Sequence, residues 1–237
     1  MSDRVCEVAY GDRRIAFTLR HADRSTLAIS VLPDGTVDVV APLGTVFEDV
    51  QTRVARRARW IVGQQRYFEQ FRPRTPLRQF VSGETHLYLG RQYRLKVVSG
   101  ERESVKLVGG RFLVVVREPS DREHVREVLE GWYRQKARER FAERLQWCWE
   151  RFGRGDAVQP DLRIRTMRSR WGSLSPSGAL SLSLDLMKAP RDCIDYVILH
   201  ELCHLEHPNH GPAFRARLEQ VLPDWEKRKH RLELTLA

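Results

Sequence analysis

Hydrophobic and polar residues alternate along the first forty residues of the chain. The alternation runs through "RIAFTL" and then through "LAISVLPDGTVDVVAP", and a period of two is typical of strands with one buried face. Asp34 and Gly35 interrupt the second run with residues that favour the positive φ of a tight hairpin turn. We therefore expect a β-meander over residues 5–40.

From residue 46 to residue 71 the hydrophobic spacing changes to that of a helix. Apolar residues recur on one face and arginines cover the other, as in a helix that packs one side onto a core. A proline-rich break, "RPRTP" at 72–76, ends this predicted helix. The apolar stripe consists of Val46, Val50, Val54, Ala58, Ile61, Val62 and Phe68.

Strand patterns return in "HLYLGRQYRLKVV" and "RFLVVVRE". The segment "EPSD" at 118–121 has the composition of a linker between domains. A long amphipathic helix is predicted from about Arg122 to Phe152, where "GRGD" ends it. We expect an α+β protein with two domains. The first is a β-rich N-terminal region with one helix over residues 1–120, and the second covers residues 121–237.

The second domain is predicted to begin with a β-hairpin, followed by a helix. "LRIRTMRSRWGSL" and "ALSLSLDL" have strand patterns, and Pro176 and Gly178 in "SPSG" provide the turn between them. Pro190 and Asp192 favour the start of a helix. The apolar positions that recur at helical spacing and would face the core are Ile194, Val197, Ile198, Leu202 and Leu205.

The segment "HELCHLEHPNH" contains four of the eight histidines of the chain. His200 and His204 are four residues apart, so both lie on one helix face, off the apolar stripe. Two imidazoles placed in this way can share a metal ion at about 2.0–2.1 Å, and Glu201 can reach the attacking water without occupying a coordination position. The helical context favours this interpretation over a chance match of surface histidines.

A catalytic zinc ion needs a third protein ligand and one open position. His210 follows His200 by ten positions, and "HPN" between them would turn the chain back toward the metal. The same offset occurs in the metzincin motif, but here His207 takes the place of the glycine and no methionine follows. We prefer His210, and the alternative third ligands are Glu219 and Glu226.

The composition, with 41% hydrophobic and 30% charged residues, is that of a globular protein. No stretch approaches the run of about 18 apolar residues that a membrane span needs, so we expect a cytoplasmic protein with no membrane partner. The cysteines form no C-x-x-C pair, which predicts buried, reduced thiols. They are Cys6, Cys148, Cys193 and Cys203.

A net charge of +10 makes a nucleic-acid partner possible, because Lys and Arg that neutralise phosphates release counterions. The arginines lie mostly on predicted helices, where a solvated face is the ordinary interpretation, and no nucleic-acid-binding motif is present. A basic surface that associates with nucleic acid therefore stays a secondary hypothesis.

Several segments resemble the YgjP-like metal-dependent hydrolases, which are related to the SprT-like zinc metallopeptidases. The resemblance is carried by "MRSRWGS" (167–173) and "SLSLDLMKAPRDCIDYVILHELCHLEHPNHGPAF" (181–214), in which "HGPAF" matches the SprT-like segment with the third histidine. "PDGTVDVVAP" and "SGETHLYLGRQYRLKV" extend it over nearly the whole chain. The chain departs from the family at Leu174, where members often have a cysteine.

The resemblance implies a compact zincin-like catalytic domain in which His200, His204 and His210 hold Zn²⁺ and Glu201 is the general base. Zinc lowers the pKa of a coordinated water toward about 7, and Glu201 would take up its proton and deliver it to the leaving group. A peptide or protein would be the substrate. Some members are assigned as pyrophosphatases acting on UTP, so a nucleoside triphosphate is the alternative.

Substrate-binding residues are predicted on the strand that precedes the metal helix. A peptide could add to the strand near Trp171, whereas Arg165, Arg168 and Arg170 could bind phosphates with Trp171 stacked on a base. Alternatively, these arginines are the polar side of a half-buried strand and Trp171 is part of the core.

The chemistry that a single zinc ion supports allows us to rank three possible functions of the predicted site. Mono-zinc chemistry suits amide hydrolysis, whereas phosphoanhydride cleavage usually recruits Mg²⁺ and carboxylate clusters. A zinc metallopeptidase is therefore favoured over a pyrophosphatase. A nucleic-acid-associated module with a structural zinc comes third, because a structural site needs no general base such as Glu201.

Overall fold

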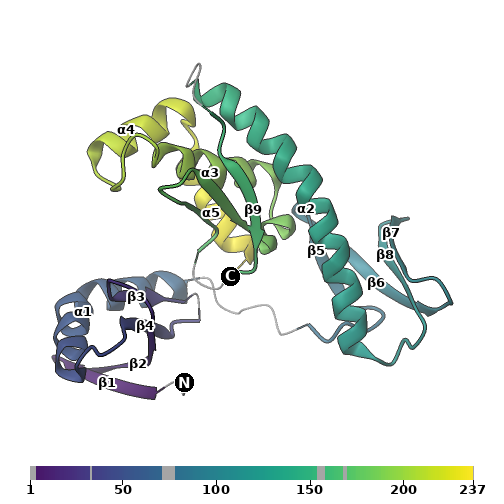
Figure 1. Ribbon diagram of the computed structural model, residues 1–237. Coiled ribbons are helices and arrows are strands. Elements are labelled where there is room, and N and C mark those ends of the chain that lie inside the picture. The colour runs from purple at the N-terminus through teal and green to yellow at the C-terminus, as the bar shows by residue number, and fades with distance from the viewer. Residues whose placement is uncertain (1–3, 33, 71–77, 154–157, 168–169, 237) are drawn as a thin grey trace. The chain divides into compact units, whose positions relative to one another are not determined.

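The computed structural model describes residues 4–32, 34–70, 78–153, 158–167 and 170–236, and its fold is mixed α+β. The chain divides into two compact units, residues 1–75 and residues 76–236, each with its own hydrophobic cluster (Figure 1). The boundary expected at 120/121 falls inside the second unit. The assignment of residues 121–237 as a zincin-like catalytic domain stays a prediction.

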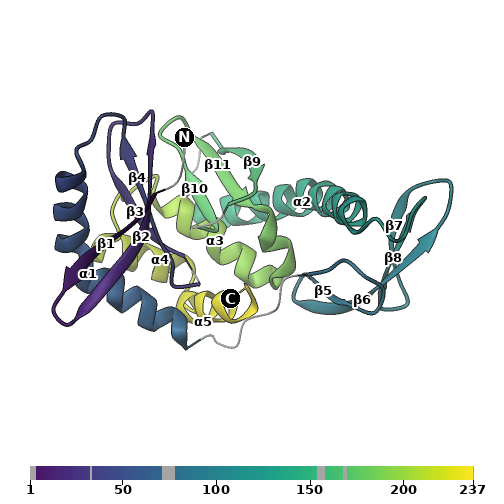
Figure 2. The ribbon, with the colours of Figure 1, turned by 90° about the horizontal axis from the view of Figure 1, so that it is seen from below.

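The first unit is a four-stranded sheet packed against one helix (Figure 2). Val50, Val54, Ala58 and Ile61 of the helix are fully buried and pack on the inward-facing residues of the sheet, such as Phe17. The elements are β1 (Arg4–Tyr10), β2 (Arg13–Ala22), β3 (Ala28–Val31), β4 (Val37–Pro42) and α1 (Phe47–Glu69).

The strand order of the first sheet is β1-β2-β4-β3, and β2 pairs with β4 in parallel. The predicted meander is therefore wrong, because the chain crosses from β2 to the edge strand β3 before it returns to β4. A period of two identifies the buried face of each strand but does not select its partner. The turn at Asp34–Gly35 is confirmed, since Gly35 has a φ of 82° and the Asp34 carboxylate accepts the Thr36 N–H.

The second unit begins with a sheet of order β5-β6-β8-β7. Tyr88 and Phe112 of this sheet make edge-to-face ring contacts with Trp132 on the helix that follows. β7 was not predicted, because its five residues form a short, half-exposed edge strand. The strands are β5 (Thr85–Tyr88), β6 (Arg91–Ser99), β7 (Ser104–Val108) and β8 (Arg111–Val116).

Helix α2 (Arg122–Phe152) has the predicted bounds. The Asp121 side chain caps it by accepting the His124 N–H, and Gly153 ends it with a φ of 69°, a left-handed conformation in which glycine is not strained. The proline-rich break at 72–76 and residues 154–156 of the "GRGD" stop lie outside the described residues.

A second sheet, of order β10-β11-β9, lies beside α2 and the helix that carries the histidines. The hairpin between β10 (Gly172–Leu174) and β11 (Ala179–Ser183) is confirmed, with Gly178 at a φ of 79°. The expected first strand of that hairpin is too long. Residues 161–165 form a separate strand, β9 (Asp161–Arg165), which pairs with the other side of β11 in parallel.

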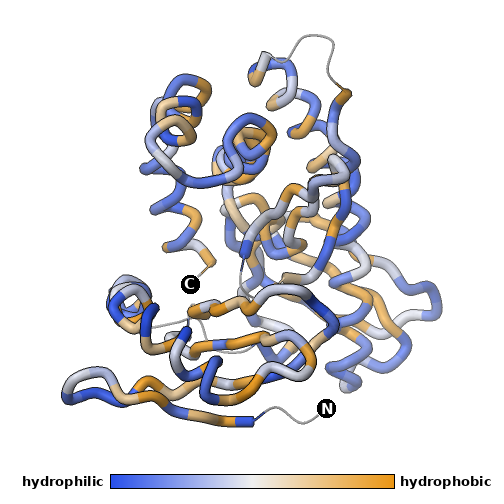
Figure 3. The backbone as a smooth tube through the Cα atoms, turned by 60° about the vertical axis from the view of Figure 1, so that its left-hand side comes forward, coloured by the Kyte–Doolittle hydropathy of each residue, from blue (hydrophilic) through white to orange (hydrophobic). Residues whose placement is uncertain are grey.

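The remaining elements of the second unit are helical. Figure 3 shows hydrophobic and hydrophilic residues interleaved along the helices, as expected where one face of each helix packs on the core. None of the helices in the described part of the chain combines the length and apolar composition needed to cross a membrane. The elements are a 3₁₀ helix, η1 (Leu184–Lys188), and α3 (Arg191–Cys203), α4 (Pro212–Val221) and α5 (Trp225–Leu236).

Candidate metal centre

Two histidines lie at the C-terminal end of helix α3, His200 in its last turn and His204 at its C-cap. Every residue from Cys193 to Leu199 is buried, whereas His200 and His204 are half-buried. The helix ends at Cys203, whose carbonyl accepts the N–H of His207, and Pro208 prevents a further helical turn. The chain therefore turns back toward α3 before α4 begins.

This turn brings the three predicted ligand histidines together. One ring nitrogen from each of His200, His204 and His210 lies within 4.8 Å of the others, and Nε2 of His200 is 3.0 Å from Nε2 of His210. Phe214 of α4 lies against all three imidazoles, with ring centroids 4.7 to 5.0 Å away. Such a group can hold a metal ion.

Hydrogen bonding orients the ring of His204. Its Nδ1 lies 3.0 Å from the carbonyl oxygen of His207, so Nδ1–H donates to this oxygen and Nε2 is left with its lone pair. Nδ1 of His200 is buried and has no hydrogen-bond partner among the described residues. The His207 side chain does not belong to this group of potential metal ligands.

The environment of the cluster favours the neutral form of His200 and His210, which is the form that binds metals. Burial lowers the pKa of His200 to about 3, with smaller contributions from His210 and His204. Partial desolvation lowers the pKa of His210 as well, and the charge of Arg215 acts in the same direction.

Glu201, between the two histidines of α3, is 8% exposed. Burial raises the pKa of this carboxyl to about 7, although the Leu174 backbone N–H donates to it and the charge of Arg170 opposes the shift. A carboxyl group with a pKa near neutrality can both accept and release a proton at neutral pH. In the absence of a metal ion, Glu201 has the environment of a general acid or base.

Gly172 makes room for Glu201, and its role was not predicted. A Cβ atom at position 172 would lie 2.9 Å from Cγ of Glu201, 3.0 Å from its Oε1 and 2.9 Å from Cγ1 of Val197. Strand β10 can therefore approach α3 closely only because residue 172 has no side chain. A glycine inside a strand pattern is the sequence signal of a close backbone approach, but it does not identify the neighbour.

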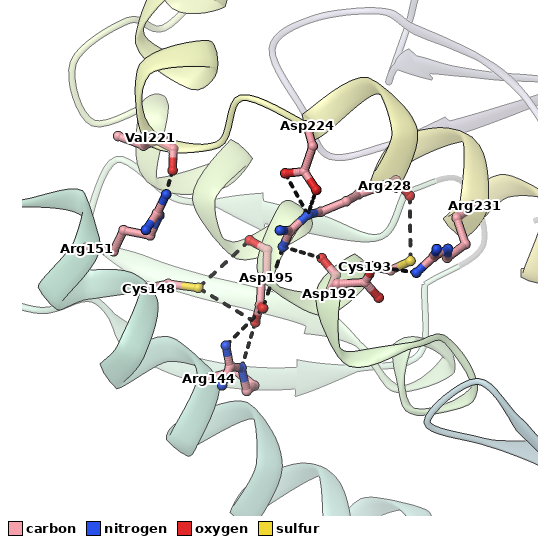
Figure 4. Close-up of polar contacts among 10 residues, drawn as sticks. All are labelled: Arg144, Cys148, Arg151, Asp192, Cys193, Asp195, Val221, Asp224, Arg228 and Arg231. Atoms are coloured by element: carbon pink, nitrogen blue, oxygen red, sulfur yellow. Dashed lines mark hydrogen bonds and ion pairs between the residues drawn. The ribbon is translucent and has the colours of Figure 1, made fainter.

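Helix α3 is held in place by a buried ion pair on the side that packs against α2 (Figure 4). The Arg144 guanidinium donates to both carboxylate oxygens of Asp195, at 2.6 and 2.9 Å, and Nη1 of Arg228 lies 3.8 Å from the same carboxylate. Asp195 is 5% exposed. These contacts join α2, α3 and α5 around the helix that carries His200 and Glu201.

The predicted substrate-binding residues are not on one strand. Arg165 ends β9, whereas Arg170 and Trp171 precede β10 at the other edge of the sheet, and Arg168 lies outside the described residues. Arg170 is exposed, and its positive charge acts to lower the pKa of Glu201. Trp171 is half-buried and packs against the main hydrophobic cluster.

The alternative third ligands do not join the histidines. Glu219 on α4 and Glu226 on α5 are both exposed, and neither belongs to the group of potential metal ligands found in the described residues. Of these three candidates, His210 is the one that lies with His200 and His204, and its role as the third ligand stays a prediction.

The sequence of the chain matches the model of a known protein family. The profile of the YgjP-like metallopeptidase domain matches residues 25–235. The chain belongs to this family. The family's chemistry implies a metal-dependent hydrolase with a divalent metal and a peptide or protein substrate.

Two solved structures are similar to part of this YgjP-like chain. One is the metallopeptidase zymogen abylysin of Pyrococcus abyssi, with 21% identity over 39% of this chain and 90% of that chain and a TM-score of 0.35. The other is the metallopeptidase zymogen jannalysin of Methanocaldococcus jannaschii, with 18% identity over 41% of this chain and 90% of that chain and a TM-score of 0.36. No curated protein is significantly similar in sequence.

Proposed function

We propose that this protein is a zinc metallopeptidase of zincin type, in which His200, His204 and His210 bind Zn²⁺ and Glu201 is the general base. The observation that carries the proposal is the convergence of three imidazole nitrogens within 4.8 Å of one another, next to a buried carboxyl on the same helix. Membership in a metallopeptidase family supports it. The relation to SprT-like peptidases is part of the same proposal.

The donor set fits zinc. Three neutral imidazoles leave one of four tetrahedral positions open, and two nitrogens bound at 2.0–2.1 Å lie about 3.3 Å apart. The Nε2 atoms of His200 and His210 are 3.0 Å apart, and all three ligand nitrogens lie within 4.8 Å of one another, so movements of the side chains alone would bring them to this spacing. When bound, zinc would supply Lewis acidity toward the substrate carbonyl and lower the pKa of the attacking water.

Glu201 would move the proton. Its carboxylate accepts a proton from the attacking water and returns it to the nitrogen of the leaving amine, so the same residue acts as base and then as acid. The Leu174 N–H holds this carboxylate, and the lack of a side chain at Gly172 lets it lie against β10. The residue is thereby oriented before substrate binds.

The outer edge of β10 would align a peptide substrate beside Glu201. β10 is an edge strand, and Ser183 N–H donates to Trp171 O while Ser175 N–H donates to Ala179 O. Backbone groups alternate in direction along a strand, so those of Gly172 and Leu174 point away from β11. The Leu174 N–H reaches Glu201 at this edge, and an added peptide strand would lie next to that carboxylate.

Arg168, Arg170 and Trp171 would contribute to substrate binding. Arg170 is exposed close to Glu201, where its guanidinium could bind a carbonyl or carboxylate of the substrate. Trp171 is half-buried and would present one side of its ring to the substrate while the other packs on the core.

Turnover of two substrate classes tests the proposal. The zinc-loaded protein and its Glu201→Gln variant are incubated with unfolded casein and with a panel of nucleoside triphosphates. We expect peptide fragments with the wild type and none with the variant, at equal zinc content. Pyrophosphate release without proteolysis would overturn the peptidase assignment in favour of the nucleotide hydrolase.

A further inference from the structure

Strand β9 forms the edge of its sheet opposite β10. The Asp161 N–H donates to Gly178 O, so the backbone groups of residues 161, 163 and 165 point toward β11. Those of Leu162 and Ile164 point the other way, because the direction alternates along a strand. No strand in the described part of the chain pairs with this side of β9, which leaves its main-chain donors and acceptors available.

A groove runs between this edge and α2, which lies next to β9 (Figure 1). It encloses about 250 Å³ and is lined by Arg134 and Arg138 of α2 and by Leu162 and Ile164 of β9. The two aliphatic side chains are half-buried and pack against the main cluster, whereas both arginines are exposed. The groove therefore has an apolar floor and a cationic wall.

No carboxylate that the structure describes neutralises the positive charge of this region. Arg134 and Arg138 have no carboxylate partner among the described residues, in contrast to Arg126, Arg140 and Arg144 elsewhere on α2, which each have one.

Arg163 and Arg165, on the other face of β9, are exposed and likewise without a carboxylate partner in the described ranges. Together with Arg134 and Arg138, they place four guanidinium groups that have no carboxylate partner in the described part of the chain around one open strand edge. A partner that complements this positive charge and pairs with the strand edge would be an extended, negatively charged segment.

We propose that β9 is a docking site for an extended acidic peptide segment, which adds to the sheet as a further strand. The free backbone groups of Leu162 and Ile164 would pair with its main chain, aliphatic side chains would enter the groove, and carboxylates would meet the arginines. A nucleic acid would use the arginines but neither the strand edge nor the aliphatic floor. The site lies at the edge opposite β10 and does not depend on the metal.

Fluorescence anisotropy with a labelled ten-residue peptide of alternating glutamate and valine tests the proposal on the full-length protein, with and without chelator. Charge reversal in the groove, Arg134→Glu with Arg138→Glu, should weaken binding at least about tenfold, because two attractive contacts become repulsive. The matched control, Arg91→Glu with Arg94→Glu, changes the charge equally on two exposed residues of β6 and should bind as the wild type does.

Two further probes separate strand addition from general charge attraction. N-methylation of alternate peptide amides should abolish binding, and hydrogen exchange should show the Leu162 and Ile164 amides protected when the unmodified peptide is bound. Equal binding of the methylated peptide, equal loss in the β6 control, or a single-stranded oligonucleotide that binds more tightly than the peptide would each overturn the proposal.

Discussion

Gly172 and Glu201 are packed so closely that no side chain fits between them. A Cβ at position 172 would lie 2.9 Å from Cγ of Glu201, closer than real Cβ contacts allow. The strand edge and the proposed general base therefore occupy positions that depend on each other.

Gly172→Ala should displace the Glu201 side chain and lower kcat by about tenfold to a hundredfold, since a shift near 1 Å is enough for such a loss. Zinc content should not change, because the three atoms nearest to an added Cβ belong to Glu201 and Val197 and not to a histidine ring. The control is Gly131→Ala on α2, where an added Cβ has nothing within 4 Å. Full peptidase activity of Gly172→Ala would contradict the positioning role.

The ion pair between Arg144 and Asp195 predicts a large effect on stability. Asp195→Ala leaves the half-buried Arg144 guanidinium without its buried partner. Breaking a fully buried pair costs about 3–5 kcal/mol, so a loss of about 2–4 kcal/mol is expected here. The exposed pair Lys136–Glu139 provides the comparison, since Lys136→Ala should cost at most about 1 kcal/mol. Urea unfolding of the three proteins measures both differences, and equal stability of Asp195→Ala and wild type would show that the network does not hold α3.

The third ligand can be tested by metal content. His210→Ala should weaken zinc binding by more than about a hundredfold. Removing a residue that only hydrogen-bonds to a ligand already lowers metal affinity by about ten- to a hundredfold, and removing a ligand itself should cost more. His207→Ala is the matched control, since His207 bonds His204 through its backbone carbonyl and its ring does not belong to the group of potential ligands. Zinc affinity is measured by competition with a chelator, and unchanged affinity of His210→Ala would point to another third ligand.

The buried cysteines should be unreactive in the folded protein. Burial raises the pKa of the Cys193 thiol to about 12 and raises that of Cys148 even more, so almost no thiolate is present at about pH 8. Mass spectrometry after N-ethylmaleimide treatment should find both residues unmodified in the native protein and both modified in denaturant. Rapid native labelling of Cys148 would mean that the α2–α3 contact opens readily.

Local patterns predicted the parts of the fold that depend on neighbours in sequence. The bounds of α2 and the turns at Gly35 and Gly178 follow from capping residues and glycines. The four-residue spacing of His200 and His204 likewise placed them one turn apart at the end of α3, where His204 is the C-cap residue. The predicted turn at Pro208 brings His210 to them.

Pairings between distant segments were not predictable from the same patterns. The parallel pairs β2–β4 and β9–β11 require crossovers that alternation does not encode, so a meander and one long strand were expected instead. The contact between Gly172 and Glu201 also depends on how β10 meets α3. For the same reason, Arg165 was grouped with Arg170, although they lie at opposite edges of the sheet.

Zinc titration of the metal-free protein tests the central claim most directly. Peptide hydrolysis should rise with added zinc until one equivalent per chain is bound, and Glu201→Gln should bind the same equivalent without hydrolysing peptide. Hydrolysis by the metal-free protein, or by zinc-loaded Glu201→Gln at the wild-type rate, would contradict the proposed zinc and general-base mechanism.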